Sequence, residues 1–119
     1  ELTKLKKLNY LYIGKNYLKE IGGEIGNLLN LKVLSFENNL LEELPEEIGD
    51  LKHLKELFLA NNLLEELPEE IVNLKHLTLL DLLNNKILFS DEQKKWLKIL
   101  SENGAEIYVD DSLIGDNNG

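Results

Sequence analysis

Apolar residues recur along this sequence at a fixed interval of 23 residues. The interval separates Leu5, Leu28, Leu51 and Leu74 in turn, and seven other columns keep the same register. These columns are Leu8/Leu31/Leu54/Leu77, Leu11/Leu34/Leu57/Leu80, Ile13/Phe36/Leu59/Leu82, Asn16/Asn39/Asn62/Asn85, Leu18/Leu41/Leu64/Ile87, Ile21/Leu44/Leu67 and Leu2/Ile25/Ile48/Ile71. A unit of this length is one supersecondary structure that buries its apolar side chains only against its neighbours. The period therefore predicts a solenoid of stacked coils.

Each unit contains a short stretch in which leucines alternate with other residues, which predicts one strand per coil. Strands of successive coils would lie about 4.8 Å apart and form a parallel sheet. In the second unit Leu34 and Phe36 should point inward, while Val33, Ser35 and Glu37 should point outward, because strand side chains alternate between the two faces.

One column contains asparagine instead of an apolar residue. It follows each strand, where the chain turns, and it consists of Asn16, Asn39, Asn62 and Asn85. An asparagine amide can hydrogen-bond backbone groups of its own coil and of the adjacent coil. We therefore expect a structural ladder of asparagines, in which the loss of one buried partner costs about 1–3 kcal/mol.

The return segment of the coil predicts a short helical turn. Its sequence is Leu-Pro-Glu-Glu-Ile at residues 44–48 and again at 67–71. Pro45 and Pro68 suit the first helical position, which needs no N–H group, and the glutamates suit the positive start of a helix. The first repeat has Ile-Gly-Gly at residues 21–23 in place of Leu-Pro-Glu, so we expect a looser turn there.

The pattern L-x-x-L-x-L-x-x-N-x-L at this period resembles the leucine-rich repeat. Residues 28–49 and 51–72 resemble its 23-residue LPxEI class, which occurs in eukaryotic Ras-associated scaffolds and in bacterial families typified by Leptospira. The resemblance covers residues 1 to about 89 and implies an α/β fold, a right-handed solenoid with a parallel concave sheet and short helical turns on the convex side. The Leptospira resemblance also implies an exported or cell-surface protein that contacts host molecules. Without it, the expected compartment is the cytoplasm.

Three parts are expected along the chain. Residues 1–89 hold four repeats preceded by the end of a truncated one, because Leu2 already occupies the column of Ile25. No polar cap precedes the first coil, so we expect either an upstream continuation or self-association through this N-terminal edge. Residues 90–110 should form a C-terminal cap, and residues 111–119 a mobile polar tail.

The cap is expected to be a helix followed by a fifth strand. Ser90 with Gln93 three residues later is a capping-box pattern, and Gly104 suits the position just after a helix. The apolar arc of this helix would consist of Trp96, Leu97, Ile99 and Leu100. Residues 106–110 then repeat the strand alternation.

The outward strand positions should form the concave binding surface of the solenoid. Its three columns are Tyr10/Val33/Glu56/Leu79/Glu106, Tyr12/Ser35/Phe58/Asp81/Tyr108 and Gly14/Glu37/Ala60/Leu83/Asp110. Aromatic side chains on a rigid surface are typical anchors for a protein partner. The candidate partner-binding residues are Tyr10, Tyr12, Val33, Phe58, Leu79, Leu83 and Tyr108. The alternative is that these side chains pack on one another and on the strands, with binding elsewhere.

A second apolar stripe follows the asparagine column. It consists of Tyr17, Leu40 and Leu63, and the fourth repeat has Lys86 there. The stripe would either extend the concave patch around one edge, meet a neighbouring molecule, or simply cover the turn.

The balance of charge limits the partners that this chain can have. Thirteen basic residues, every one of them lysine, stand against 22 acidic residues, for a net charge of −9. Without arginine there is no guanidinium group to read guanine edges or to hold phosphates in bidentate fashion, so nucleic acid is an unfavourable partner.

Glutamates gather on the return side and lysines precede the strands. This separation either orients a charged partner or keeps the surface solvated.

Neither catalysis nor a cofactor is indicated. The chain has no cysteine, no phosphate-binding glycine loop and no pairing of a nucleophile with a base. His53 and His76 share a column, but no third ligand shares it, so no metal site is expected. No apolar run reaches the roughly 18–20 residues that cross a membrane. The sequence thus predicts a non-catalytic module that binds a protein or peptide on its concave sheet. The alternative is a structural or self-assembling end piece of a larger regulatory or surface protein.

Overall fold

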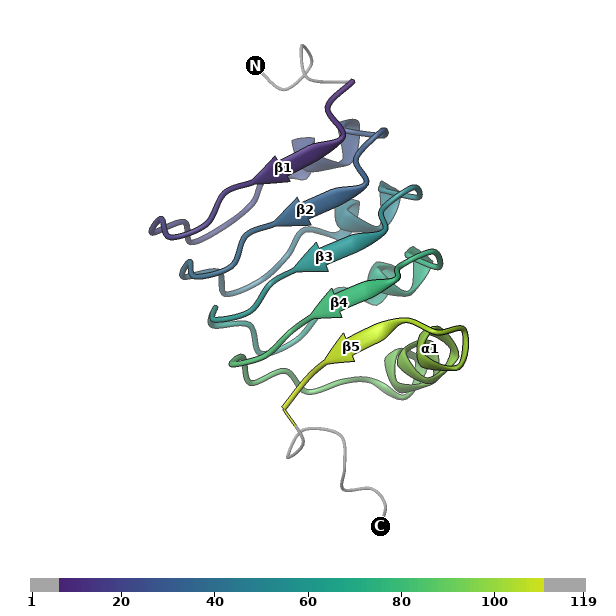
Figure 1. Cartoon of the computed structure of the whole chain (residues 1–119). Coiled ribbons are helices and arrows are strands. Elements are labelled where there is room, and N and C mark those ends of the chain that lie inside the picture. The colour runs from purple at the N-terminus through teal and green to yellow at the C-terminus, as the bar shows by residue number, and fades with distance from the viewer. Residues whose placement is uncertain (1–6, 111–119) are drawn as a thin grey trace.

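A computed structural model describes residues 7–110 and shows a stack of coils, each contributing one short strand to a parallel sheet (Figure 1). The strands are β1 (Tyr10–Tyr12), β2 (Val33–Ser35), β3 (Glu56–Phe58), β4 (Leu79–Asp81) and β5 (Glu106–Tyr108), and they follow one another in this order across the sheet. The register confirms the 23-residue period, since Leu11, Leu34, Leu57 and Leu80 lie side by side. The last step, from Leu80 to Ile107, is longer because a helix replaces the usual return turn.

Short 3-10 helices form the opposite side of the first three coils, behind the sheet in Figure 1. They are η2 (Gly23–Asn27), η3 (Glu46–Asp50) and η4 (Glu69–Asn73). The expected helical turns are therefore present, but the proline position was wrong. Pro45 and Pro68 are N-caps with extended backbone, and each supplies the carbonyl that accepts the first helical hydrogen bond. The looser turn expected in the first repeat is also absent, because η2 is a five-residue 3-10 helix like the others.

The neighbouring 3-10 helices approach one another so closely that glycine is needed between them. A Cβ atom added at Gly49 would lie 2.5 Å from the backbone oxygen of Glu70, and one at Gly26 would lie 2.9 Å from the Cβ of Glu47. The next position in this column is Val72, on η4, which faces the C-terminal helix instead of another 3-10 helix. The glycines therefore set the spacing of the coils on this side.

The core lies between the sheet and the 3-10 helices. The repeated leucines of the second and third coils, among them Leu34, Leu57 and Leu64, are fully buried. The first coil differs, since Leu8, Leu11, Ile13, Leu18 and Ile21 are only partly buried and pack against the edge of the core. Leu2 and Leu5, which belong to the expected N-terminal edge, lie outside the described residues.

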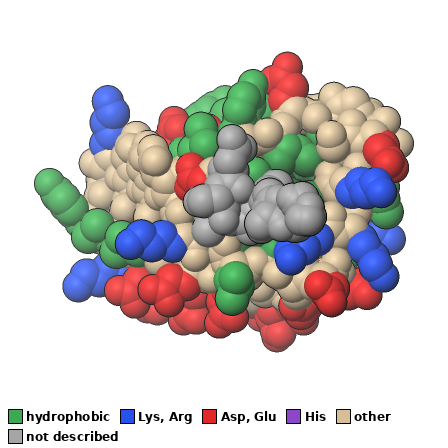
Figure 2. Space-filling model, turned by 90° about the horizontal axis from the view of Figure 1, so that it is seen from below, with side chains coloured by type: hydrophobic (Ala, Val, Ile, Leu, Met, Phe, Trp, Pro, Cys, Tyr) green, Lys and Arg blue, Asp and Glu red, His purple; other side chains and the backbone are tan. Residues whose placement is uncertain are grey.

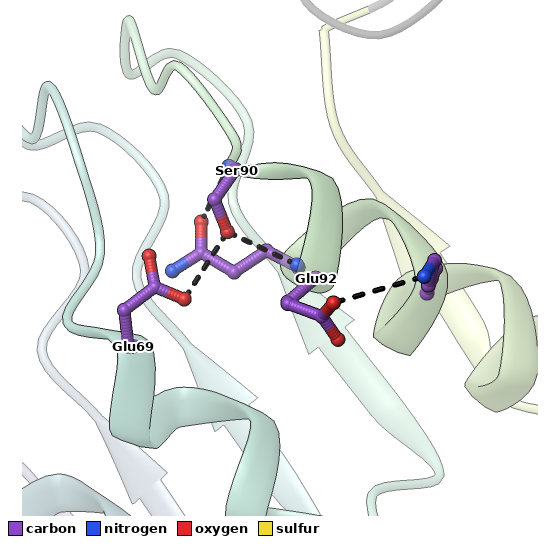
Figure 3. A network of polar contacts seen from close by, with 5 residues as sticks. Glu69, Ser90 and Glu92 are labelled. Carbon is purple, nitrogen blue, oxygen red and sulfur yellow. Dashed lines mark hydrogen bonds and ion pairs between the residues drawn. The ribbon is translucent and has the colours of Figure 1, made fainter.

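The C-terminal cap begins at α1 (Asp91–Glu102), which closes the core next to η4 and β5. The predicted capping box is present: the Gln93 backbone N–H donates to Ser90 Oγ, and the Ser90 N–H donates to Gln93 Oε1. The Ser90 hydroxyl also donates to Glu69 on the preceding coil, which ties the helix start to η4 (Figure 3). This local network therefore fixes where the helix begins.

The other end of α1 stops at a glycine, as expected. Gly104 has a φ of 97°, and its N–H donates to the Ser101 carbonyl while the Ala105 N–H donates to the Leu100 carbonyl. These two bonds form the Schellman motif that ends many helices. The fifth strand follows but covers residues 106–108, two residues fewer than the expected 106–110. The tail expected at residues 111–119 lies outside the described part.

The buried face of α1 is narrower than the predicted apolar arc. Trp96, Leu97 and Leu100 are buried, and the Trp96 indole N–H donates to the Leu74 carbonyl at 3.0 Å. Ile99, by contrast, is 56% exposed, so its assignment to the core was wrong. Among the helices and strands of residues 7–110, α1 contacts η4 and β5, and residues on its other side, such as Ile99, are exposed to solvent.

Candidate functional site

The concave sheet rests on a ladder of buried asparagines, as the sequence indicates. Asn62 is typical: its amide donates to the carbonyls of Phe36 and Leu59, and its oxygen accepts from the Leu41 N–H at 3.0 Å. Asn39 and Asn85 make the corresponding bonds in their own coils. Each ladder side chain therefore joins its own coil to the preceding one.

Asn16 departs from the ladder. It is exposed, and its side-chain amide donates to the Gly14 carbonyl within its own coil. Its assignment as a buried ladder residue was wrong, because the described part of the chain places no coil before the first one.

A second asparagine column was not recognised from the sequence. Asn38, Asn61 and Asn84 have φ angles of 59–61° and are exposed, and Lys15 takes this left-handed conformation in the first coil. Asparagine tolerates the left-handed region better than most residues. The Asn84 side-chain amide also donates to the Asn61 oxygen at 2.7 Å. The repeated Asn-Asn pairs in the sequence are the signal that could have revealed this turn.

The residues expected to bind a partner lie on the outer face of the sheet. Tyr12, Ser35, Phe58, Asp81 and Tyr108 are in cross-strand register, and so are Tyr10, Val33, Glu56, Leu79 and Glu106. Three of the aromatic side chains are strongly exposed, at 56% for Tyr10, 66% for Tyr12 and 44% for Tyr108. Phe58, Leu79 and Leu83 are half-buried. These two predicted columns are thus correct, and they place the tyrosines on β1 and β5, at the two ends of the sheet.

Val33 and Ser35 lie on this face but are not exposed. Val33 lies between Tyr10 and Glu56 in register and is 6% exposed, and Ser35 lies between Tyr12 and Phe58 and is 3% exposed. Their expected exposure was wrong, because larger neighbours flank both small side chains on the adjacent strands. Val33 therefore forms the floor of the surface and offers little area to a partner.

Carboxylates share the concave face with the aromatic rings. Glu106 accepts a hydrogen bond from the Tyr108 hydroxyl at 3.1 Å, and Asp81 accepts one from the Leu83 N–H at 3.2 Å. The hydrogen bond that Tyr108 donates to Glu106 and the charge of that carboxylate raise the pKa of Tyr108, and partial burial and the Asp81 charge act in the same direction. Asp110 accepts from the Asn84 N–H at 3.1 Å. The face is therefore acidic as well as aromatic.

The second stripe is exposed at two of its three apolar positions. Tyr17 is 85% and Leu63 is 52% exposed, while Leu40 is half-buried. Leu63 and Lys86 line a shallow open hollow at the edge of the molecule, next to Asp110 of the concave face. The full lining is Asn62, Leu63, Glu65, Asn84, Asn85, Lys86 and Asp110.

Charged side chains are distributed unevenly around the solenoid. In Figure 2 acidic side chains gather along one side of the molecule. Glutamates of the return segments are mostly exposed, and they are Glu42, Glu43, Glu46, Glu47, Glu65, Glu66, Glu69 and Glu70. Across residues 7–110 the one ion pair joins Lys95 to Glu92, at 3.7 Å, between neighbours on α1 (Figure 3).

Two negative findings apply to the described residues only. No group of three or more His, Cys, Asp or Glu side chains within residues 7–110 has an arrangement that could hold a metal ion. In the same range, no helix is both long enough and apolar enough to cross a membrane.

Strands, ladder asparagines and short return helices that recur every 23 residues define a leucine-rich-repeat solenoid. A family model described as leucine rich repeat matches residues 6–64 and 30–87, which together exceed half of the chain. The chain therefore belongs to the leucine-rich repeat family. A search of curated proteins gave no significant match.

Solved structures show the same fold. A leucine-rich-repeat protein of Leptospira interrogans is similar over 89% of this chain and 26% of its own, with 42% identity and a TM-score of 0.75. An internalin of Listeria monocytogenes is similar over 92% of this chain and 32% of its own, with 22% identity and a TM-score of 0.70. A plant peptide hormone receptor, RGFR1, solved in complex with RGF2, is similar over 92% of this chain and 18% of its own, with 25% identity and a TM-score of 0.71. The chain thus spans about a quarter of the Leptospira protein, and the similarity confirms a bacterial-type leucine-rich repeat protein.

Proposed function

We propose that this chain is a non-catalytic interaction module that binds a protein or peptide partner on its concave sheet. The observation that carries the proposal is the exposure of Tyr10, Tyr12 and Tyr108 on a surface held by buried asparagines. Tyrosines bring large contact areas with few rotatable bonds, and a preformed sheet loses little conformational entropy on binding. The leucine-rich repeat is generally an interaction fold, and the similar plant receptor was solved with RGF2, which supports a partner-binding role.

Capture of a partner from cell extracts tests the proposal. The chain is immobilised beside a variant that carries Tyr12→Ser, Phe58→Ser and Tyr108→Ser on the concave face. A matched control replaces three exposed apolar residues away from this face: Leu29, Leu88 and Ile99, which are 55%, 76% and 56% exposed, are each changed to serine. Circular dichroism confirms that both variants are folded before they are used.

The proposal expects one protein to be retained by the wild-type chain and by the control variant but lost by the concave variant. Equal retention by all three chains would exclude the concave face as the binding surface. Retention that is lost only in the control variant would move the binding surface to the outer side of the coils.

A second candidate function is self-assembly, favoured by the exposure of the second stripe and the partly buried side chains of the first coil. Tyr17 and Leu63 are exposed apolar groups of the stripe. In the first coil, Leu11 and Leu18 are only partly buried, whereas the equivalent Leu34 and Leu41 of the next coil are fully buried. Analytical ultracentrifugation distinguishes this function from partner binding. Concentration-dependent association that is abolished by Tyr17→Ser with Leu63→Ser would support self-assembly, and a monomer at all concentrations would exclude it.

A further inference from the structure

The concave face has carboxylates at five positions and no basic residue in its three columns. Its acidic residues are Glu37, Glu56, Asp81, Glu106 and Asp110. Four of them are half-buried, and Glu106 is exposed. Lys32 and Lys55 precede β2 and β3, and Lys86 lines the hollow beside Asp110, but none of the three forms an ion pair with these carboxylates. The negative charge of the face is therefore not neutralised by the described part of the chain.

Asp81 has the most distinctive surroundings of the five. It lies in register between Phe58 on β3 and Tyr108 on β5, so both of its neighbours on the adjacent strands are aromatic, and neighbouring strand backbones are about 4.8 Å apart. Glu56 and Glu106 lie two residues before these rings on the same strands, and hence on the same face. A point above Asp81 is thus close to two rings and to two further carboxylates.

The electrostatic effect of this arrangement already reaches a neighbouring group. The Asp81 charge contributes to the raised pKa of Tyr108, although the hydrogen bond from Tyr108 to Glu106 is the larger cause. Asp81 Oδ1 accepts from the Leu83 N–H, which holds the carboxylate in place from the side of its own strand. A backbone N–H group, and not a cation, therefore orients the Asp81 carboxylate.

We infer that this half of the concave face binds a positively charged segment of the partner, with a lysine or arginine head group above Asp81 and between Phe58 and Tyr108. An aromatic face attracts a cation through its quadrupole, and a carboxylate adds a charge-assisted hydrogen bond. The inference rests on the proposed function and specifies the chemistry of the partner. The five strands extend over about 19 Å, which matches about six residues of an extended chain.

The test uses two labelled peptides of about twelve residues, long enough to cross the whole sheet. The cationic probe has lysine at every third position with leucine, glycine and serine between, and the neutral probe has glutamine in place of each lysine. Binding to the full chain is followed by fluorescence anisotropy at low and at moderate salt.

Two variants with the same change in net charge separate a local site from general attraction. The concave variant carries Asp81→Asn and Glu56→Gln, and the asparagine keeps an oxygen that can accept from the Leu83 N–H. The control variant carries Glu43→Gln and Glu66→Gln, at exposed positions on the return segments leading into η3 and η4. Both variants lose two negative charges from a chain of net charge −9.

The inference expects the concave variant to bind the cationic probe about tenfold more weakly than wild type, while the control stays within about twofold. Equal weakening by both variants would overturn it, because attraction would then follow net charge alone. Absence of binding by the cationic probe would also overturn it. The capture experiment would then decide whether a partner of different chemistry binds the concave face. Equal affinity for both probes, lost in the Tyr12→Ser, Phe58→Ser and Tyr108→Ser variant, would overturn the cationic partner and retain the concave binding surface.

Discussion

Replacement of Asn62 by alanine should lower the free energy of unfolding by about 2–4 kcal/mol. The change leaves the Leu41 N–H without its acceptor in a buried position, which alone costs about 1–3 kcal/mol. The carbonyls lose less, because Phe36 keeps the bond from Asn39 and Leu59 keeps the bond from Asn85. These lost second bonds add about 1 kcal/mol together.

Asn16→Ala provides the comparison within the same column. Asn16 is exposed, and among the described residues its side chain bonds to the Gly14 carbonyl of its own coil alone, so its replacement should cost no more than about 0.5 kcal/mol. Urea denaturation measures both values, with the fluorescence of the single tryptophan, Trp96, and far-ultraviolet circular dichroism as probes. Equal costs for Asn16→Ala and Asn62→Ala, or a cost below about 1 kcal/mol for Asn62→Ala, would refute the assignment of stability to the ladder bonds.

Three further outcomes are expected. Gly49→Ala should destabilise the fold by about 1–3 kcal/mol and lower its thermal midpoint, because the new Cβ would lie 2.5 Å from the Glu70 backbone oxygen. Lys15→Asn should stabilise it by about 0.5–1 kcal/mol in urea denaturation, because Lys15 has a φ of 57°. Glu106→Gln should lower the pKa of Tyr108, followed by NMR, because the charge and acceptor that favour the neutral phenol are weakened. Since the folded pKa lies above the ordinary value of 10.0, the contribution to stability is complete below pH 10.0 and disappears as pH rises through the raised pKa.

Each of these expectations has a contrary result. An unchanged midpoint for Gly49→Ala would mean that η3 and η4 separate at no cost. A destabilising Lys15→Asn would mean that the lysine makes a contact that outweighs its backbone strain. A Tyr108 pKa that does not move in Glu106→Gln would mean that the hydrogen bond to Glu106 is not formed in solution.

The register of the coils could be predicted from sequence because one period places every equivalent residue in the same environment. Leu34 and Leu57 each lie between two leucines along the stack, and Leu80 lies between Leu57 and Ile107, so their burial follows from their position in the unit. Asn16 is the exception for the same reason, since no coil precedes its own among residues 7–110. Periodicity therefore predicts the interior of a solenoid better than its ends.

Exposure on the outer face could not be predicted in this way. It depends on the size of the two cross-strand neighbours, and these vary between repeats because the outward positions are not part of the repeated pattern. Val33 is covered between Tyr10 and Glu56, whereas Tyr12, next to the small Ser35, stays exposed. The exposure of Ile99 on α1 could not be predicted either. Ile99 falls within the wide apolar arc of the helix but lies beyond the narrow stripe that η4 and β5 cover.

The asparagine ladder also predicts the order in which the coils become structured during synthesis. The oxygen of each buried ladder asparagine accepts from an N–H group 21 residues earlier, and its amide donates to a carbonyl 26 residues earlier. A coil emerging from the ribosome therefore has unpaired backbone groups until the following repeat has been translated. Ordered structure along the nascent chain should consequently trail translation by one repeat, because the residues that complete each turn are the last to be made.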